Sequence, residues 1–167
     1  MRWFDRRFEL GLSANALPGI VRRLRSTPDR LESTLTSLTP ERLILKPGGS
    51  WSAQENAGHL LDLEPLWSGR LEDLLAGEER LRPAELTNHK THSANHNDQP
   101  TAAITTAFRR QREELVVRVE AASPTELEAT ALHPRLRQRM SVADLFFFVA
   151  EHDDHHLARI VELAEQG

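Results

Sequence analysis

The stretch SVADLFFFVAEHDDHHLARI, residues 141–160, carries the clearest structural signal in this chain. Apolar residues and histidines recur in it at steps of three and four, the spacing that places side chains on one face of an α-helix. The stripe consists of Val142, Leu145, Val149, His152 and His156. Ser141, with Asp144 three residues later, matches the capping box that begins a helix. We therefore predict a helix over 141–165 whose inner face carries two histidines.

The same spacing recurs through the rest of the chain, and no segment shows the sustained alternation of a half-buried strand. Ser52 and Glu55 form another capping-box pattern. The earlier helices are predicted over 16–38, with a candidate break at Thr27-Pro28, over 52–75 and over 101–122. Because 167 residues suit one ordinary domain, we predict a single all-α domain over 1–167, built as a four-helix bundle.

Composition narrows the classes of function. With 39% hydrophobic residues, 28% charged residues and a net charge of -4, the chain has the profile of a soluble globular protein. The arginine clusters at 22–25 and 135–139 lack the interleaved aromatic residues of single-strand binders, so no nucleic-acid partner is predicted. The absence of cysteine excludes disulfides, thiolate metal ligands and cysteine nucleophiles. Any site chemistry must therefore use histidine and carboxylates.

Nothing in the sequence predicts a membrane segment. The longest apolar run, 145–150, is far shorter than the roughly 20 residues needed to cross a bilayer. Residues 1–10 carry several charges where a signal peptide requires an unbroken apolar run. We therefore expect a cytoplasmic protein with no membrane partner.

Three histidines fall on the predicted core faces. His152 and His156 are one helical turn apart, so their rings can converge on one ion. The spacing alone is weak evidence, since His92 and His96 share it, and the pattern leaves either a shared metal or hydrogen-bonded core histidines open. His59 lies on the inner stripe of the predicted helix 52–75. Together the three rings would leave coordination positions open, as expected of a catalytic zinc.

The segments WSAQENAGHLLD, residues 51–62, and AEHDDHHLARI, residues 150–160, together resemble the DinB-like superfamily of damage-inducible bacterial proteins and thiol-dependent transferases. The resemblance spans nearly the whole chain and includes HPRL at 133–136. It implies a four-helix bundle in which a long crossover makes the second and third helices parallel. It also implies a three-histidine site for one divalent ion, Zn²⁺ or Ni²⁺ first, with His59, His152 and His156 at the ligand positions.

The polar connection 82–100 is long for a compact domain, and such segments are often functional. If the crossover is as the resemblance implies, four of its residues could rim the pocket, with a plain surface loop as the alternative: His92, Asn95, His96 and Asn97. Carboxylates commonly accept the second N–H of a metal-bound imidazole. The candidates for that role, each of which could equally be solvated, are Glu55, Asp62, Asp153 and Asp154.

Two further expectations concern helix 141–165. His155 is adjacent to the inner stripe and is expected to pack or pair outward, with Glu151 as the candidate partner. The run 146–148 of three phenylalanines exceeds what one stripe buries, which suggests a homodimer contact, with a thicker core as the alternative. Trp51 and Trp67 are expected to pack.

The functional hypothesis is a metal-dependent enzyme acting on a small-molecule substrate. The ion would lower the pKa of a bound water molecule or of an incoming substrate thiol and present it as a nucleophile. Because the chain has no cysteine, any thiol must come from a low-molecular-weight co-substrate. A thiol S-transferase is the first hypothesis and a metal-dependent hydrolase the second. The non-enzymatic alternative is a stress-response bundle that binds metal or a partner.

Overall fold

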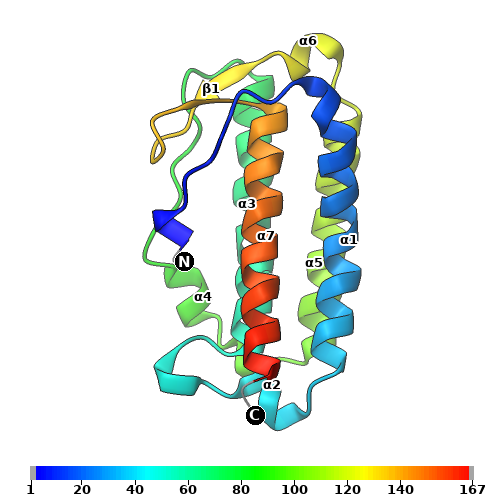
Figure 1. Ribbon diagram of the computed structural model, residues 1–167, viewed down its shortest axis with the longest axis vertical. Coiled ribbons are helices and arrows are strands. Elements are labelled where there is room, and N and C mark those ends of the chain that lie inside the picture. The colour runs from blue at the N-terminus through cyan, green and yellow to red at the C-terminus, as the bar shows by residue number, and fades with distance from the viewer. Residues whose placement is uncertain (1–2, 166–167) are drawn as a thin grey trace.

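The computed structural model describes residues 3–165, and most of them are helical (Figure 1). The helices are α1 (Leu17–Thr36), α2 (Pro40–Ile44), α3 (Ala53–Leu75), α4 (His89–Ser93), α5 (Thr101–Glu120), α6 (Pro124–Leu127) and α7 (Val142–Glu165). Short 3-10 turns precede several of them. The strands are β1 (Thr130–Leu132) and β2 (Arg139–Ser141). The four long helices, α1, α3, α5 and α7, lie side by side as the sequence predicts.

Capping residues set the starts of α3 and α7. Ser52 accepts a hydrogen bond from the Glu55 backbone, and Glu55 accepts one from the Ser52 backbone in return. Ser141 and Asp144 make the equivalent pair at α7. Asp144 also accepts hydrogen bonds from the backbone N–H groups of residues 11 and 12, so it fastens the N-terminal segment to the start of α7. The sequence rule for helix starts therefore holds at both helices.

The candidate break at Thr27-Pro28 does not occur, and α1 is continuous through Pro28. Proline removes one backbone hydrogen bond from a helix interior. The Thr27 hydroxyl donates to the Arg23 carbonyl, while Thr27, Pro28 and Leu31 are all buried on the inner face. Packing of this face therefore keeps the helix intact.

The long crossover makes α3 and α5 parallel, as the family resemblance implies. Gln54, at the start of α3, donates to the Gln99 carbonyl and accepts from the Thr101 hydroxyl at the start of α5. Residues 76–100 descend beside α3 to reach this point (Figure 1). The parallel helices α3 and α5 therefore begin at the same end of the bundle, close to His59.

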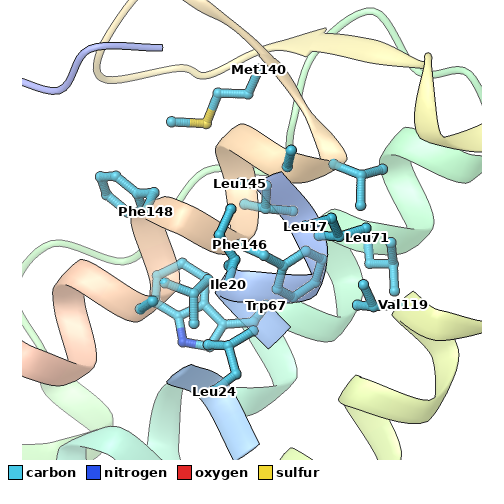
Figure 2. Packing of buried hydrophobic residues seen from close by; sticks show 14 of the residues in the cluster. Leu17, Ile20, Leu24, Trp67, Leu71, Val119, Met140, Leu145, Phe146 and Phe148 are labelled. Atoms are coloured by element: carbon cyan, nitrogen blue, oxygen red, sulfur yellow. The ribbon is translucent and has the colours of Figure 1, made fainter. Parts of the chain in front are cut away.

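The core at the other end is rich in aromatic and aliphatic side chains from all four long helices (Figure 2). Phe146 and Phe148 are buried there, and Phe147 is half-buried with the Arg23 guanidinium 5.9 Å from its ring. One chain thus covers most of the apolar surface that suggested a dimer contact. The homodimer remains a prediction.

A two-stranded antiparallel sheet departs from the all-α expectation. Ala131 pairs with Met140, and both are buried under the end of the bundle. Three-residue strands are too short to show alternation, so the sequence pattern could not reveal them. The turn between them, closed by the His133 N–H donating to the Gln138 carbonyl, carries residues 133–138 to the side of α3 and α7.

Among residues 3–165, no helix is both long enough and apolar enough to span a bilayer.

Candidate metal centre

Three histidines from α3 and α7 converge inside the bundle. One nitrogen from each of His59, His152 and His156 lies within 4.8 Å of the others. The ring centroid of His59 is 5.4 Å from that of His152 and 4.7 Å from that of His156, and the two α7 rings are 4.5 Å apart. The four-residue step along α7 and the antiparallel approach of α3 produce this meeting point. The arrangement is one that could hold a metal ion.

The three rings are buried and carry no charge at neutral pH. Their exposed fractions are 4% for His59, 3% for His152 and 8% for His156. Burial lowers the pKa of His59 to about 4. Burial and the neighbouring histidines lower the pKa values of His152 and His156 well below the usual value. Neutral imidazole is the form that donates a lone pair to a metal.

A hydrogen-bond relay orients His59. The Thr91 hydroxyl donates to Asp62 over 3.0 Å, so its oxygen accepts from the His59 Nδ1–H, also at 3.0 Å. Burial alone would raise the pKa of Asp62, but hydrogen bonds from His96 and Thr91 outweigh burial and lower it. An ionised carboxylate therefore stands behind the ring, and the His59 Nε2 lone pair is left free.

Asn56 orients His156 in a similar way. The Asn56 amide nitrogen donates to the Ser52 carbonyl at 2.8 Å, which directs its oxygen toward His156 Nδ1 at 2.9 Å. His156 then donates from Nδ1 and keeps Nε2 free. Asn56 lies about one turn of α3 before His59, and Asp62 lies about one turn after it. The helix that carries His59 therefore also carries residues that orient His59 and His156.

His152 supplies the test of whether a metal fits. Its Nδ1 is buried and has no hydrogen-bond partner among residues 3–165. Its ring lies between Trp3, at a centroid distance of 5.0 Å, and Trp67, at 5.6 Å. A buried imidazole among aromatic rings needs a polar partner, and an ion held by one ring nitrogen of His152 together with His59 and His156 would give this ring one. The residues present therefore fit a divalent metal.

The cluster opens into a pocket of about 370 Å³. All three tryptophans of the chain, Trp3, Trp51 and Trp67, contribute to its walls, together with Phe148 and the three histidines. Residues 83–86 and Asn88 of the crossover form another part of the wall. The site thus combines nitrogen donors with a largely apolar chamber large enough for a small organic molecule.

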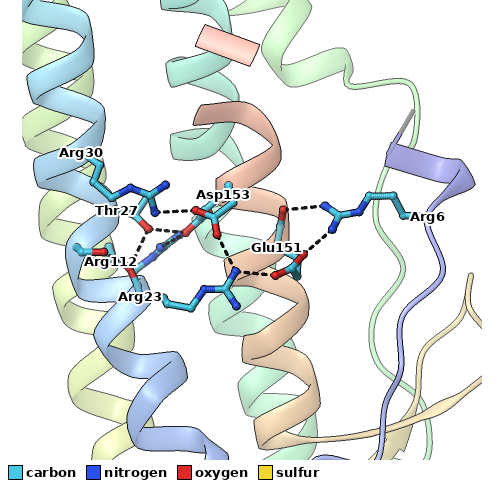
Figure 3. Close-up of polar contacts among 9 residues, drawn as sticks. Arg6, Arg23, Thr27, Arg30, Arg112, Glu151 and Asp153 are labelled. Atoms are coloured by element: carbon cyan, nitrogen blue, oxygen red, sulfur yellow. Dashed lines mark hydrogen bonds and ion pairs between the residues drawn. The ribbon is translucent and has the colours of Figure 1, made fainter. Parts of the chain in front are cut away.

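His155 also lines this pocket, which corrects the expectation that it pairs outward with Glu151. Glu151 instead forms ion pairs with Arg6 and Arg23, two residues distant in sequence (Figure 3). The His155 ring lies 5.1 Å from that of His156, and burial and the nearby Arg6 lower its pKa. Trp51, expected only to pack, forms part of the same wall.

The structure does not place the four polar residues expected at the rim in the wall of the pocket. His96 is buried and bonds Asp62 at 2.8 Å, while Asn97 accepts from the Ser52 hydroxyl at 2.7 Å. His92 is exposed and packs its ring edge against Trp51, and Asn95 is an exposed residue with left-handed backbone. None of the four is among the pocket-lining residues. The crossover closes the pocket with an earlier segment, 83–88, than the histidine pattern suggested.

The carboxylates expected to hold the histidine rings have different partners in the structure. Asp62 reaches His59 through Thr91. Glu55 caps α3 and pairs with Lys46, and Asp154 pairs with Arg23 and Arg30. Asp153 binds Arg112 of α5 and Thr27 of α1 and no histidine of the cluster (Figure 3). Within residues 3–165, Asp62 is the only one of these carboxylates that reaches a histidine of the cluster through hydrogen bonds.

Sequence reasoning did not single out Arg70, His133 and Arg135, which line the pocket. Arg70 lies in the middle of α3, where an arginine resembles an ordinary solvated helix residue. His133 belongs to the HPRL segment, and Arg135 belongs both to that segment and to the arginine cluster at 135–139. The HPRL segment, adjacent to the last helix, is the sequence feature that could have pointed to His133 and Arg135.

Comparisons with known structures agree with the fold. The chain resembles the structure of YfiT from Bacillus subtilis, described as a probable metal-dependent hydrolase with an unusual four-helix bundle topology. The TM-score is 0.83 at 16% identity, covering 96% of this chain and 93% of that one. It also resembles the mycothiol-dependent maleylpyruvate isomerase, with a TM-score of 0.67 at 10% identity, covering 85% of this chain and 59% of that one. At such identities these likenesses concern the fold.

A search of curated proteins found no match. The family model of the DinB superfamily matches residues 23–160, which include the whole histidine cluster. The chain therefore belongs to the DinB superfamily.

Proposed function

We propose that this protein is a metal-dependent enzyme in which His59, His152 and His156 bind one divalent ion, Zn²⁺ or Ni²⁺ first, and that it transfers a low-molecular-weight thiol to a small organic substrate. The observation that carries the proposal is the position of the histidine cluster at the wall of an apolar pocket. Among residues 3–165 the cluster has no fourth protein ligand. A purely structural ion would need one.

When bound, the ion would act as a Lewis acid that favours the ionised form of a thiol or water at neutral pH. The protein's own residues prepare the site. The Thr91–Asp62 relay and Asn56 fix the ring orientations of His59 and His156. Trp3, Trp67 and Phe148 exclude bulk water and receive the apolar part of a substrate. His155, beside His156, offers an imidazole nitrogen at the same wall for a proton leaving the reacting group.

A metal-dependent hydrolase is the second candidate. The likeness to YfiT, itself described as a probable metal-dependent hydrolase, favours it. The apolar pocket favours a thiol nucleophile instead, and because the chain has no cysteine that thiol would have to come from a co-substrate. The two candidates share the same ligands and differ in the nucleophile that enters the pocket.

Elemental analysis of the purified protein tests the metal assignment. We expect about one equivalent of a divalent ion in the parent protein and its loss in His59→Ala and His156→Ala. The control is His89→Ala, which removes an exposed histidine outside the pocket and should keep the ion. A full complement of metal in both ligand variants would refute the assignment.

Turnover separates the two candidates. The purified protein is incubated with a chlorodinitrobenzene electrophile with and without cysteine as the thiol, and separately with a nitrophenyl ester. Metal-dependent conjugation that requires the thiol supports the transferase. Ester hydrolysis without thiol supports the hydrolase. Inactivity in both reactions, across a panel of thiols and esters, counts against an enzymatic role.

A further inference from the structure

Arg70, His133 and Arg135 form a cationic cluster at the pocket wall, apart from the metal-binding histidines. Arg70 comes from the middle of α3 and is only 2% exposed. It donates from Nε to the Arg82 carbonyl and from Nη1 to His133 Nε2, each over 3.1 Å. His133 and Arg135 come from the turn between β1 and β2. Two guanidinium groups thus meet in a largely apolar enclosure.

Among residues 3–165, no carboxylate forms an ion pair with this cluster. Neither Arg70 nor Arg135 forms an ion pair in this part of the chain. Asp73 is the acid that raises the pKa of Arg70, but its carboxylate is paired with Arg82 at 2.7 Å. Burial and the proximity of Arg135 lower the pKa of Arg70 to about 10, and burial lowers that of Arg135. Burial and the two arginines lower the pKa of His133 to about 3, so its ring is neutral. The cluster thus carries two positive charges that have no ion-pair partner in the described part of the chain.

Arg112 shows what this protein does with a structural buried arginine. It is 1% exposed, and it pairs with Glu64 at 2.6 Å and also with Asp153. Burial would lower the pKa of Arg112, but the two carboxylates outweigh burial and raise it. A buried charge is ordinarily neutralised in this way because an unpaired one is costly. Arg70 is almost as buried as Arg112 and departs from that pattern, with the partly buried Arg135 beside it at the pocket wall.

The cluster also has more hydrogen-bond donors than acceptors. The buried Nη2 of Arg135 has no partner among residues 3–165. The two ring nitrogens of His133 face donors on both sides, Arg70 Nη1 on one and the backbone N–H groups of Arg135 and Leu136 on the other. A neutral imidazole has a single acceptor nitrogen. The cluster therefore lacks a hydrogen-bond acceptor, which an anion at the pocket wall would supply.

Aromatic rings separate this cluster from the metal-binding histidines by a single layer. The Arg70 guanidinium lies 5.5 Å from the Trp67 ring, which lies 5.6 Å from the His152 ring. The Arg135 guanidinium lies 6.0 Å from the Phe148 ring, which also lines the pocket. The same chamber thus has positive charge at one part of its wall, aromatic surface next to it, and nitrogen donors beyond.

We propose that Arg70 and Arg135 bind an anionic group of the substrate, a carboxylate or a phosphate monoester, whose apolar body lies against Trp67 and Phe148. The anion site itself stands on the arginine cluster alone. That the other end of the molecule reaches the histidines rests on the proposed function. The enzyme would therefore select amphipathic organic anions over neutral analogues of the same size.

Direct binding of six-carbon probes tests the proposal. Hexanoate, hexyl phosphate and hexan-1-ol are titrated into the purified protein by calorimetry, with tryptophan fluorescence as a second readout. We expect at least one anion to bind at least tenfold more tightly than the alcohol, since hydrogen bonds to charged groups are worth a factor of about ten or more. Whichever anion binds more tightly identifies the headgroup. Equal affinity for the alcohol and both anions would overturn the proposal.

Variants locate the anion. Arg135→Gln should weaken binding of the preferred anion at least tenfold, while Arg137→Gln, an exposed arginine of the same turn outside the pocket, should leave it unchanged. Arg70→Lys keeps the charge but loses the fork-shaped donor set, and it too should weaken binding. Circular dichroism checks folding. Unchanged affinity in both Arg135→Gln and Arg70→Lys would refute the assignment.

Replacing one of the metal-binding histidines distinguishes anion binding at the arginines from anion binding at the metal. In His156→Ala, metal should be lost while the anion affinity stays within about threefold of the parent. If the anion instead requires His156 and ignores Arg135, it binds at the metal and the arginine site is wrong. A protein without metal or turnover that still binds the anion through Arg135 would refute the proposed function and leave this inference standing.

Discussion

Replacing Thr91 by valine removes the link between His59 and Asp62 with little change in side-chain volume. In the parent protein the Thr91 oxygen accepts from His59 Nδ1 and donates to Asp62, both over 3.0 Å. Valine can do neither. Asp62 keeps His96 at 2.8 Å and Lys90 at 3.4 Å, so the carboxylate retains partners. The loss falls on His59, whose N–H is left unpaired in a buried position.

Loss of such a supporting partner typically weakens metal binding 10- to 100-fold, or about 1.4–2.7 kcal/mol. The unpaired N–H should also lower the free energy of unfolding by about 1–3 kcal/mol. Competition between the protein and a chromophoric chelator for Zn²⁺ at neutral pH measures the first quantity, and denaturant titration the second. Thr105→Val is the matched control, because its buried hydroxyl bonds only the Ala102 carbonyl of its own helix.

The control should keep the parent's zinc affinity. If Thr91→Val is folded and also binds zinc within twofold of the parent, Thr91 does not hold the ring and the relay has no role in metal binding.

Three further changes probe the fold around the site. Arg112→Met leaves the buried Glu64 and Asp153 without their cation and should reduce the free energy of unfolding by about 3–5 kcal/mol in denaturant titration; a loss under about 1 kcal/mol would contradict this. The pKa of His133 is lowered to about 3 from 6.5, so the unfolded chain takes up the proton first. Stability is then complete above about pH 6.5 and falls as the pH drops toward 3, and His133→Asn should flatten that slope by up to about 1.4 kcal/mol per pH unit, an unchanged slope counting against it. Gly58→Ala would place a Cβ 2.2 Å from the His96 ring and should lower the melting temperature, whereas Gly19→Ala, with its nearest atom at 3.8 Å, should not.

The long helices could be predicted from the sequence because their determinants are local. The Ser52–Glu55 and Ser141–Asp144 pairs marked two helix starts to within one residue. The sheet and α4 could not be predicted in this way, whereas α6 begins at the same kind of pair, Ser123 and Glu126. The hydrogen bonds and burial of the sheet and α4 depend on contacts such as that of Leu81 with Leu132, which no short-range pattern encodes.

The histidine cluster was accessible for the same reason. His152 and His156 continue an apolar stripe, and His59 lies on the inward face of α3, so helix periodicity alone brings them toward the interior. The side chains around them depend on the path of the crossover. Neither Thr91 behind His59 nor Arg70 at the pocket wall is marked by any spacing. Glu151 was assigned the wrong partner because its arginines come from residues 6 and 23.

The three histidines and the pocket wall at 83–88 come from different parts of the chain, and this separation affects how the protein could diversify. The nitrogen donors belong to α3 and α7, whose packing the whole bundle depends on, whereas residues 83–88 of the crossover contribute only a part of the pocket wall. Connections accept substitutions and insertions far more readily than packed helices. Substitutions confined to 83–88 can therefore change which molecules fit the pocket while His59, His152 and His156 stay in place, so two proteins with the same three histidines need not accept the same molecules.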